Sequence, residues 1–196
     1  DGKQVEQTWN GRLSQDVEQV VTIPKEALDD ASKILLKVYP GIFSQIVEGL
    51  DAILRMPSGC FEQTSSTTYP NVLVLDYMKQ TQKITPEIQM KAESYINTGY
   101  QRLLSYEVQG GGFEWFGNSP AHKILTAYGL LEFYDMAQVH EVDPNVIART
   151  QQWLVAQQES NGSWKPTQQY LDEVAGKFTN DVMRNTAYIT WALVST

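Results

Sequence analysis

The sequence predicts a mostly α-helical chain, part of an α/α toroid of helical hairpins, with a short β segment before it. Three observations lead to this fold class. From residue 40 onward, apolar residues recur at spacings of three and four, as they do on one face of a helix. Several of these stretches open with a capping residue followed by proline, which favours the first helical position. A glycine-aromatic turn followed by a helix occurs twice, which indicates repeated helical pairs.

The β segment is expected in residues 1–39. One short apolar run spans residues 17–23 and is stopped by a proline, and a second spans residues 34–39. The second run ends at the Pro40-Gly41 breaker, after which the helical pattern begins. This change of pattern predicts a domain boundary, with residues 40–196 forming the helical part.

Helix starts are expected at definite residues in this helical part. Thr85-Pro86, Ser119-Pro120 and Asp143-Pro144 each place a capping residue before a proline. Pro70 is expected to start or kink another helix, because proline cannot donate an intrahelical hydrogen bond. An amphipathic stripe comes before all of these, at Ile42, Ile46, Leu50, Ile53 and Leu54.

The internal repeat pairs a turn with a helix. Gly112-Phe113-Glu114-Trp115 precedes Leu125-Thr126-Ala127-Tyr128, and Gly162-Ser163-Trp164 precedes Asn185-Thr186-Ala187-Tyr188. The turn and the helix are farther apart in the second copy. The sequence therefore predicts an inserted loop there, which contains Asp172.

Composition argues against several functions. A net charge of −8 speaks against a nucleic-acid partner, which would need a basic face. No apolar run approaches the ~18 residues of a membrane-spanning helix. The single cysteine excludes an internal disulfide. With two distant histidines it also makes a poor ligand set for zinc, so no metal and no cofactor are expected.

The single cysteine is followed three residues later by a glutamine, and this pair is the candidate reactive site. Cys60 can supply a nucleophilic sulfur, and Gln63 can supply an acyl group with ammonia as leaving group. Attack of the sulfur on the side-chain amide would close a small ring, an internal thioester. A helix N-terminus just after Gly59 would stabilise the thiolate that this chemistry needs. Taken alone, the two residues fit a buried, inert cysteine better.

The surrounding residues resemble the thioester signature of the alpha-macroglobulin and complement family, Met-Pro-x-Gly-Cys-x-Glu-Gln. Here the signature reads Met56-Pro57-Ser58-Gly59-Cys60-Phe61-Glu62-Gln63. The likeness continues through residues 70–77, 84–87 and 95–102. One departure is Phe61, where vertebrate members usually carry glycine. The resemblance implies a thioester between Cys60 and Gln63, supported by Gly59, Phe61 and Glu62.

The resemblance also has implications for the domains. It implies that residues 1–39 are part of a CUB-like β domain, whose other half would supply the missing strand partners. Residues 40–196 would then be the N-terminal part of the thioester domain. The chain is expected to be a fragment of a larger protein, with the remaining macroglobulin domains as partners. The absence of disulfides favours a bacterial member, and the family implies an extracytoplasmic location, secreted or periplasmic.

The implied function is that of a broad-spectrum protease-trapping inhibitor, and not of an enzyme. A target protease would cleave a bait region elsewhere, and a nucleophile on that protease would take the Gln63 acyl group. Family members with histidine at one loop position favour hydroxyls. Counting back without gaps from residues 187–190 places that position on Asp172, and counting from Gly176 places it on Leu171. Neither residue is histidine, so a reaction with amines is expected.

Two alternatives belong to the same family resemblance: a complement-like opsonin, which tags surfaces through the thioester, and a binding module without a thioester. Residues 158–164 also fit a turn of triterpene cyclases, but the acid-rich Asp-x-Asp-Asp motif of those enzymes is absent. A thioester must be kept dry, and the candidates for that shield are Met56, Phe61, Tyr69, Phe113, Trp115 and Tyr170.

Overall fold

The chain divides into two compact units, Asp1–Tyr39 and Pro40–Thr196. A computed structural model describes residues 4–28, 30–39, 49–50, 52–82, 84–167 and 181–196.

The first unit contains no β-strand among its described residues, 4–28 and 30–39. Its local order consists of turns, such as the one closed by Ala27 N–H donating to the Pro24 carbonyl at 3.0 Å. The expected strands are therefore not formed here. A strand is stabilised by a neighbouring strand and by burial of one face, and in this unit apolar side chains such as Val20 and Ile34 are exposed.

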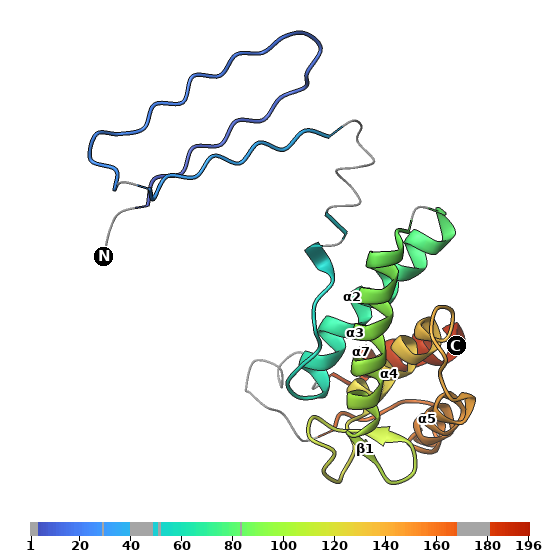
Figure 1. Ribbon diagram of the computed structural model, residues 1–196. Coiled ribbons are helices and arrows are strands. Elements are labelled where there is room, and N and C mark those ends of the chain that lie inside the picture. Colours follow the sequence, from blue (N-terminus) through green and yellow to red (C-terminus); the bar gives the residue numbers. More distant parts are fainter. Residues whose placement is uncertain (1–3, 29, 40–48, 51, 83, 168–180) are drawn as a thin grey trace. The chain divides into compact units, whose positions relative to one another are not determined.

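The second unit is mostly helical, as predicted (Figure 1). A small antiparallel hairpin joins two of its helices, with Glu107 paired to Phe113 and Val108 to Gly112. None of the helices in the described part of the chain is long and apolar enough to span a bilayer. The elements with described bounds are α2 (Phe61–Gln80), α3 (Pro86–Leu104), β1 (Glu107–Val108), β2 (Gly112–Phe113), α4 (Lys123–Met136), α5 (Pro144–Ala156) and α7 (Val182–Ser195).

Two of the predicted helix starts are confirmed. Helix α3 begins at Pro86, and the Thr85 hydroxyl accepts the Ile88 N–H at 3.4 Å. Helix α5 begins at Pro144, and the Asp143 carboxylate accepts the Asn145 N–H at 2.9 Å. In both helices the side chain satisfies a backbone donor that has no partner within the helix.

Two other helix predictions are wrong in detail. No helix begins at Ser119-Pro120, because α4 starts at Lys123 with His122 as its capping residue. The His122 N–H donates to the Phe113 carbonyl at 2.7 Å, which ties this stretch to the hairpin. Pro70 lies inside α2, whose first residue is Phe61, so it does not start a helix, and the alternative of a kink at this residue stays a prediction.

Helix α4 is the centre of the second unit. It packs against α2, α5 and α7, and it contributes buried residues to both hydrophobic clusters. Helix α2 also packs on α3, and at this contact the two helices come very close. A Cβ atom added at Gly99 of α3 would lie 2.1 Å from the Thr68 hydroxyl oxygen of α2. The position of α2 is therefore fixed from two sides.

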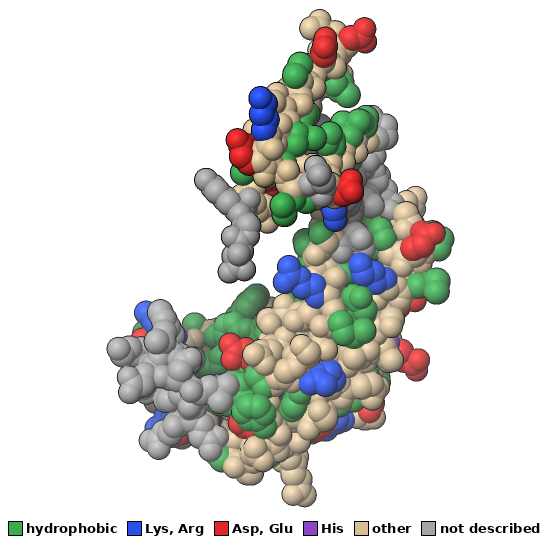
Figure 2. Space-filling view, turned by 60° about the vertical axis from the view of Figure 1, so that its left-hand side comes forward, with side chains coloured by type: hydrophobic (Ala, Val, Ile, Leu, Met, Phe, Trp, Pro, Cys, Tyr) green, Lys and Arg blue, Asp and Glu red, His purple; other side chains and the backbone are tan. Residues whose placement is uncertain are grey.

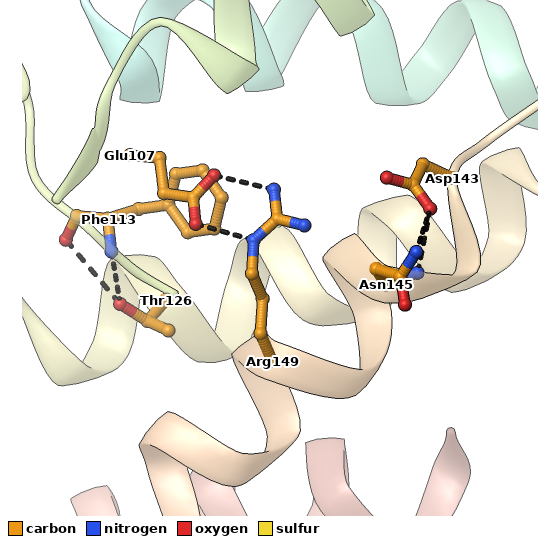
Figure 3. A network of polar contacts seen from close by, with 6 residues as sticks. All are labelled: Glu107, Phe113, Thr126, Asp143, Asn145 and Arg149. Atoms are coloured by element: carbon orange, nitrogen blue, oxygen red, sulfur yellow. Dashed lines mark hydrogen bonds and ion pairs between the residues drawn. The ribbon is translucent and has the colours of Figure 1, made fainter. Parts of the chain in front are cut away.

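The hairpin is fastened to the helices by polar contacts (Figure 3). The Arg149 guanidinium donates twice to the Glu107 carboxylate, at 2.6 and 2.7 Å. The Phe113 N–H donates to the Thr126 hydroxyl of α4 at 2.8 Å. In the second copy of the repeat, the Trp164 N–H donates to the Thr186 hydroxyl at 3.1 Å. The two copies therefore share one local geometry, a turn bonded to a helical threonine.

The described surface carries both acidic and basic side chains, without a large patch of one charge in the view shown (Figure 2). In the view of Figure 2, acidic and basic side chains are interspersed over the described surface.

Candidate functional site

The predicted cysteine and glutamine meet at the start of α2. The helix begins directly after Cys60, which is its N-cap residue, so the expected helix N-terminus is confirmed. The Gln63 side chain turns back, and its Oε1 accepts the Cys60 backbone N–H at 3.2 Å. The Cys60 side chain faces the Gln63 backbone N–H, which completes a reciprocal capping box. The carboxamide therefore lies against the residue that carries the thiol.

Gly59 makes this folded-back position of Gln63 possible. Its φ of +84° is a conformation that L side chains rarely adopt. A Cβ atom at this position would lie 2.0 Å from Gln63 Oε1 and 2.8 Å from Gln63 Cδ. Any side chain here would occupy the space of the carboxamide, so residue 59 must be glycine for this arrangement.

The Gly59 carbonyl is held by two residues that the sequence analysis did not assign. Arg102 Nη2 donates to this oxygen at 2.8 Å, and the Tyr106 hydroxyl donates at 2.5 Å. These residues lie 43 and 47 positions away in the chain. They are four residues apart, as neighbours on a helix face are, but nothing in their spacing identifies Gly59 as the acceptor.

Phe61 anchors the start of α2 in the core. Its side chain is fully buried, and its ring centroid lies 5.3 Å from that of Phe113 and 6.3 Å from that of Tyr106. Its backbone N–H donates to the Trp115 carbonyl at 2.9 Å. A Cβ atom at Gly129 of α4 would lie 2.8 Å from the tip of the ring, so α4 leaves room for it.

Glu62 is exposed and is held by a hydrogen bond from the hairpin side of the site. The Trp115 indole N–H donates to Glu62 Oε2 at 3.2 Å. Trp115 therefore bonds both of the first two residues of α2, one through its carbonyl and one through its ring. This contact gives Glu62 a structural role at the helix start.

The expected shield is incomplete in the described part of the site. Cys60 is buried and belongs to the same hydrophobic cluster as the buried side chains of Phe61, Phe113 and Trp115. Gln63 is exposed, however. Two of the other candidates do not cover it, because Met56 is 54% exposed and the Tyr69 hydroxyl donates to Asp135 instead. The last candidate, Tyr170, lies outside the described residues. The two candidates for the tuning position, Asp172 and Leu171, also lie outside the described residues.

His122 lies close to this site, behind Trp115. Its ring centroid is 4.8 Å from that of the indole, and its Nδ1 accepts the Leu125 N–H at 3.3 Å. Burial, together with the Lys123 charge, lowers the pKa of His122 to about 4, although Glu114 opposes the shift. The imidazole is therefore neutral at neutral pH. Within the described ranges no group of three or more His, Cys, Asp or Glu side chains could hold a metal ion.

Glu132 of α4 is a buried carboxyl group in the core. Neither carboxyl oxygen has a hydrogen-bond partner among the described residues. Burial raises the pKa of Glu132 to about 8, although the nearby Ser65 hydroxyl lowers it. Ser65 Oγ does not reach hydrogen-bond geometry, so burial is the dominant effect and the carboxyl is mainly protonated at neutral pH.

This raised pKa makes stability depend on pH. The folded state holds the proton more tightly than the unfolded chain, where the ordinary pKa is 4.5. The contribution of the Glu132 proton to the free energy of unfolding is therefore complete below pH 4.5, and it is lost as the pH rises toward 8. We expect Glu132→Gln to become more stable relative to the wild type as the pH increases over this range. The limiting slope is about 1.4 kcal/mol per pH unit.

Urea unfolding of both proteins at several pH values measures this difference. The exposed Glu18→Gln serves as the control, and its stability relative to the wild type should change little with pH. A stability difference between Glu132→Gln and the wild type that is the same at every pH would mean that folding does not raise the pKa of Glu132.

Comparison with known proteins gives one family and several relatives. Residues 31–196 match the model described as the A-macroglobulin TED domain. The chain is 28% identical to ovostatin of Gallus gallus over 184 residues, which is 93% of this chain and 12% of ovostatin. The chain thus spans about an eighth of the length of this curated relative.

Several solved structures with a similar fold come from bacteria. Salmonella alpha-2-macroglobulin reacted with methylamine is 23% identical, with a TM-score of 0.53 over 76% of this chain and 9% of that one. Native Escherichia coli alpha-2-macroglobulin, from domain MG7 to the C-terminus, is 24% identical with a TM-score of 0.53. The match covers 76% of this chain and 22% of that one.

Proposed function

Because this chain belongs to the A-macroglobulin TED domain family, we propose that Cys60 and Gln63 form an internal thioester in a protease-trapping alpha-macroglobulin. The family is one of protease inhibitors and not of enzymes. The observation that carries the proposal is the capping box, in which the Gln63 carboxamide is turned back onto Cys60. Gly59 leaves room for the carboxamide, and the buried Phe61 holds the start of α2 in the core. Glu62 supports the same helix start by accepting the hydrogen bond from the Trp115 indole.

The chemistry has two balanced steps. In the first, the Cys60 sulfur attacks Gln63 Cδ, the C–N bond breaks, and ammonia leaves with the thiol proton. In the second, an amine on an attacking protease attacks the same carbon and the C–S bond breaks. The amine loses a proton to the Cys60 sulfur, so the products are an amide and a free thiol. Each molecule can act only once, because the acyl group stays on the target.

A working trap needs a cover for the bond. Among the described residues Gln63 is exposed and the buried apolar side chains lie on the side of Cys60, so we assign the cover to the rest of the parent protein. The domain is part of a larger alpha-macroglobulin, and its family is generally extracellular or periplasmic. We further propose that residues 1–39 belong to a CUB-like domain and that residues 40–196 begin the thioester domain. On this proposal, cleavage of the parent by a protease uncovers Gln63.

Intact mass spectrometry of the full-length parent tests the thioester. The native protein should be one ammonia lighter than its sequence, and methylamine should add at Gln63 and release one titratable thiol. Cys60→Ala is the matched control and should show neither change. If the mass of the wild type equals the mass calculated from its sequence and no methylamine is taken up, the thioester proposal is wrong. The function that remains is then that of a binding module without a thioester.

The protease-trap and opsonin functions can be distinguished by identifying the molecule that becomes covalently linked to Gln63. After proteolytic activation, a trap should become covalently linked to the activating protease, and the link should survive denaturation. An opsonin should instead label cell surfaces or carbohydrate, whether or not the protease is captured. Because the expected tuning residue is not histidine, we favour the amine-reactive trap.

Asp172→His tests the nucleophile preference. An imidazole at this position could take the acyl group first and pass it to a hydroxyl, so we expect faster reaction with glycerol relative to methylamine. Leu171→His is the matched variant, because the second count assigns the position to that residue. If neither variant changes the ratio of the two rates, the tuning position lies elsewhere.

A further inference from the structure

One peptide group at the site is hydrogen bonded at both of its ends. Its carbonyl, that of Gly59, accepts from Arg102 Nη2 at 2.8 Å and from the Tyr106 hydroxyl at 2.5 Å. The Thr64 hydroxyl adds a longer contact at 3.4 Å. Its N–H, that of Cys60, donates to Gln63 Oε1 at 3.2 Å. The carbonyl and the N–H of a trans peptide point in opposite directions, so these contacts form one continuous chain.

Such a series of hydrogen bonds orients and strengthens the last hydrogen bond in it, which here is the one from the Cys60 N–H to Gln63 Oε1. Donors on the carbonyl oxygen fix the plane of the peptide and polarise it, and the N–H becomes a better donor. Here the last acceptor is the oxygen of the acyl group that the proposed chemistry uses. Arg102 and Tyr106 therefore act on Gln63 without touching it.

We infer that Arg102 and Tyr106 are positioning residues for the acyl chemistry, which aim the Cys60 N–H at the Gln63 oxygen and make it an oxyanion donor. This inference rests on the proposed thioester function. In both steps the attacked carbon becomes tetrahedral and negative charge collects on the former Oε1. The Cys60 N–H already points at that oxygen, so it can stabilise the charge without reorganisation.

The surroundings of the two side chains fit this role. The Tyr106 ring packs edge-on against the buried Phe61, at 6.3 Å between centroids, which limits its movement. Arg102 Nη2 also donates to the Tyr106 hydroxyl at 3.1 Å. Arg102 Nε is buried without a hydrogen-bond partner among the described residues, and the guanidinium makes both of these hydrogen bonds through Nη2.

Tyr106→Phe in the full-length parent tests the inference, because it removes one hydroxyl and keeps the ring. An oxyanion donor contributes about a hundred- to a thousandfold in rate, and cooperative strengthening is about 10–30% per bond. We therefore expect methylamine to react with the formed thioester about two- to eightfold more slowly. Arg102→Met should have an effect in the same direction, and Tyr77→Phe, at an exposed tyrosine of α2, should react as the wild type does.

A spectroscopic measurement separates positioning from a loss of structure. Isotope-edited infrared spectroscopy of the Gln63 acyl carbonyl should show a higher stretching frequency in Tyr106→Phe, because the hydrogen bond to its oxygen is weaker. A meta-fluorinated tyrosine at position 106, a stronger donor of the same shape, should lower the frequency and raise the rate.

The outcomes distinguish this inference from the proposed function. A wild-type thioester that forms, together with Tyr106→Phe and fluorotyrosine proteins that match the wild type in rate and frequency, overturns the positioning role alone. A wild type that takes up no methylamine overturns both. Slower reaction with no change in frequency also overturns the inference, because a general loosening of the site would then explain the rate.

Discussion

Replacing Gly59 with alanine is expected to abolish methylamine uptake at Gln63. The new Cβ atom would lie 2.0 Å from Gln63 Oε1, so the carboxamide would have to leave its position against Cys60. Alanine would also be strained at the φ of +84°, at a cost of roughly 1–2 kcal/mol. Intact mass of the full-length Gly59→Ala protein should equal its sequence mass before and after methylamine.

Gly162→Ala is a matched control for the strain alone. Gly162 has a φ of +82°, close to that of Gly59, but an added Cβ atom would meet only a side-chain nitrogen at 3.9 Å. This variant should lose stability to a similar extent and still take up methylamine. If Gly59→Ala took up methylamine as the wild type does, the folded-back carboxamide could not be the reactive geometry.

Phe61→Ala is expected to give the largest loss of stability, about 3–5 kcal/mol in the free energy of unfolding. The ring is fully buried and packs against the rings of Phe113 and Tyr106. Removing it would leave a cavity under the start of α2, next to Gly129 of α4. The cavity cannot close easily, because the backbone of Phe61 is bonded to the Trp115 carbonyl.

Urea unfolding measures this loss, and Phe116→Ala is the control. Phe116 is 59% exposed, so its truncation removes little buried surface and should cost well under 1 kcal/mol. Equal losses for the two variants would mean that Phe61 does not anchor the helix. The presence of phenylalanine where vertebrate members usually carry glycine would then have no structural explanation.

The proposed reactive pair was open to prediction because its signals are local. The three-residue spacing of Cys60 and Gln63 fits the first turn of a helix, where a capping box turns the third side chain back. Thr85 and Asp143 were likewise sufficient to locate the starts of α3 and α5. In each case the atoms that interact lie within a few residues, so the sequence pattern contains the contact.

Other features were not predictable because they depend on distant residues. The start of α4 was expected at Pro120, but the hydrogen bond from His122 to Phe113 moves it to Lys123. The strands expected in residues 1–39 are not assigned among the described residues of that unit, because strand formation requires a partner. Local propensity was overridden in the first case and was insufficient in the second.

The sequence by itself determined the helical class, the family, and the pairing of one thiol with one carboxamide, because these follow from periodicity and from a short run of residues. Only the tertiary structure decided what holds that pair in place. It brought Arg102 and Tyr106 to the carbonyl of a glycine more than forty residues earlier, and it put Phe61 and Trp115 beneath the helix start. These contacts depend on how α2, α3 and the hairpin pack against one another. Because this packing joins residues that are far apart in the sequence, no local sequence pattern predicts it.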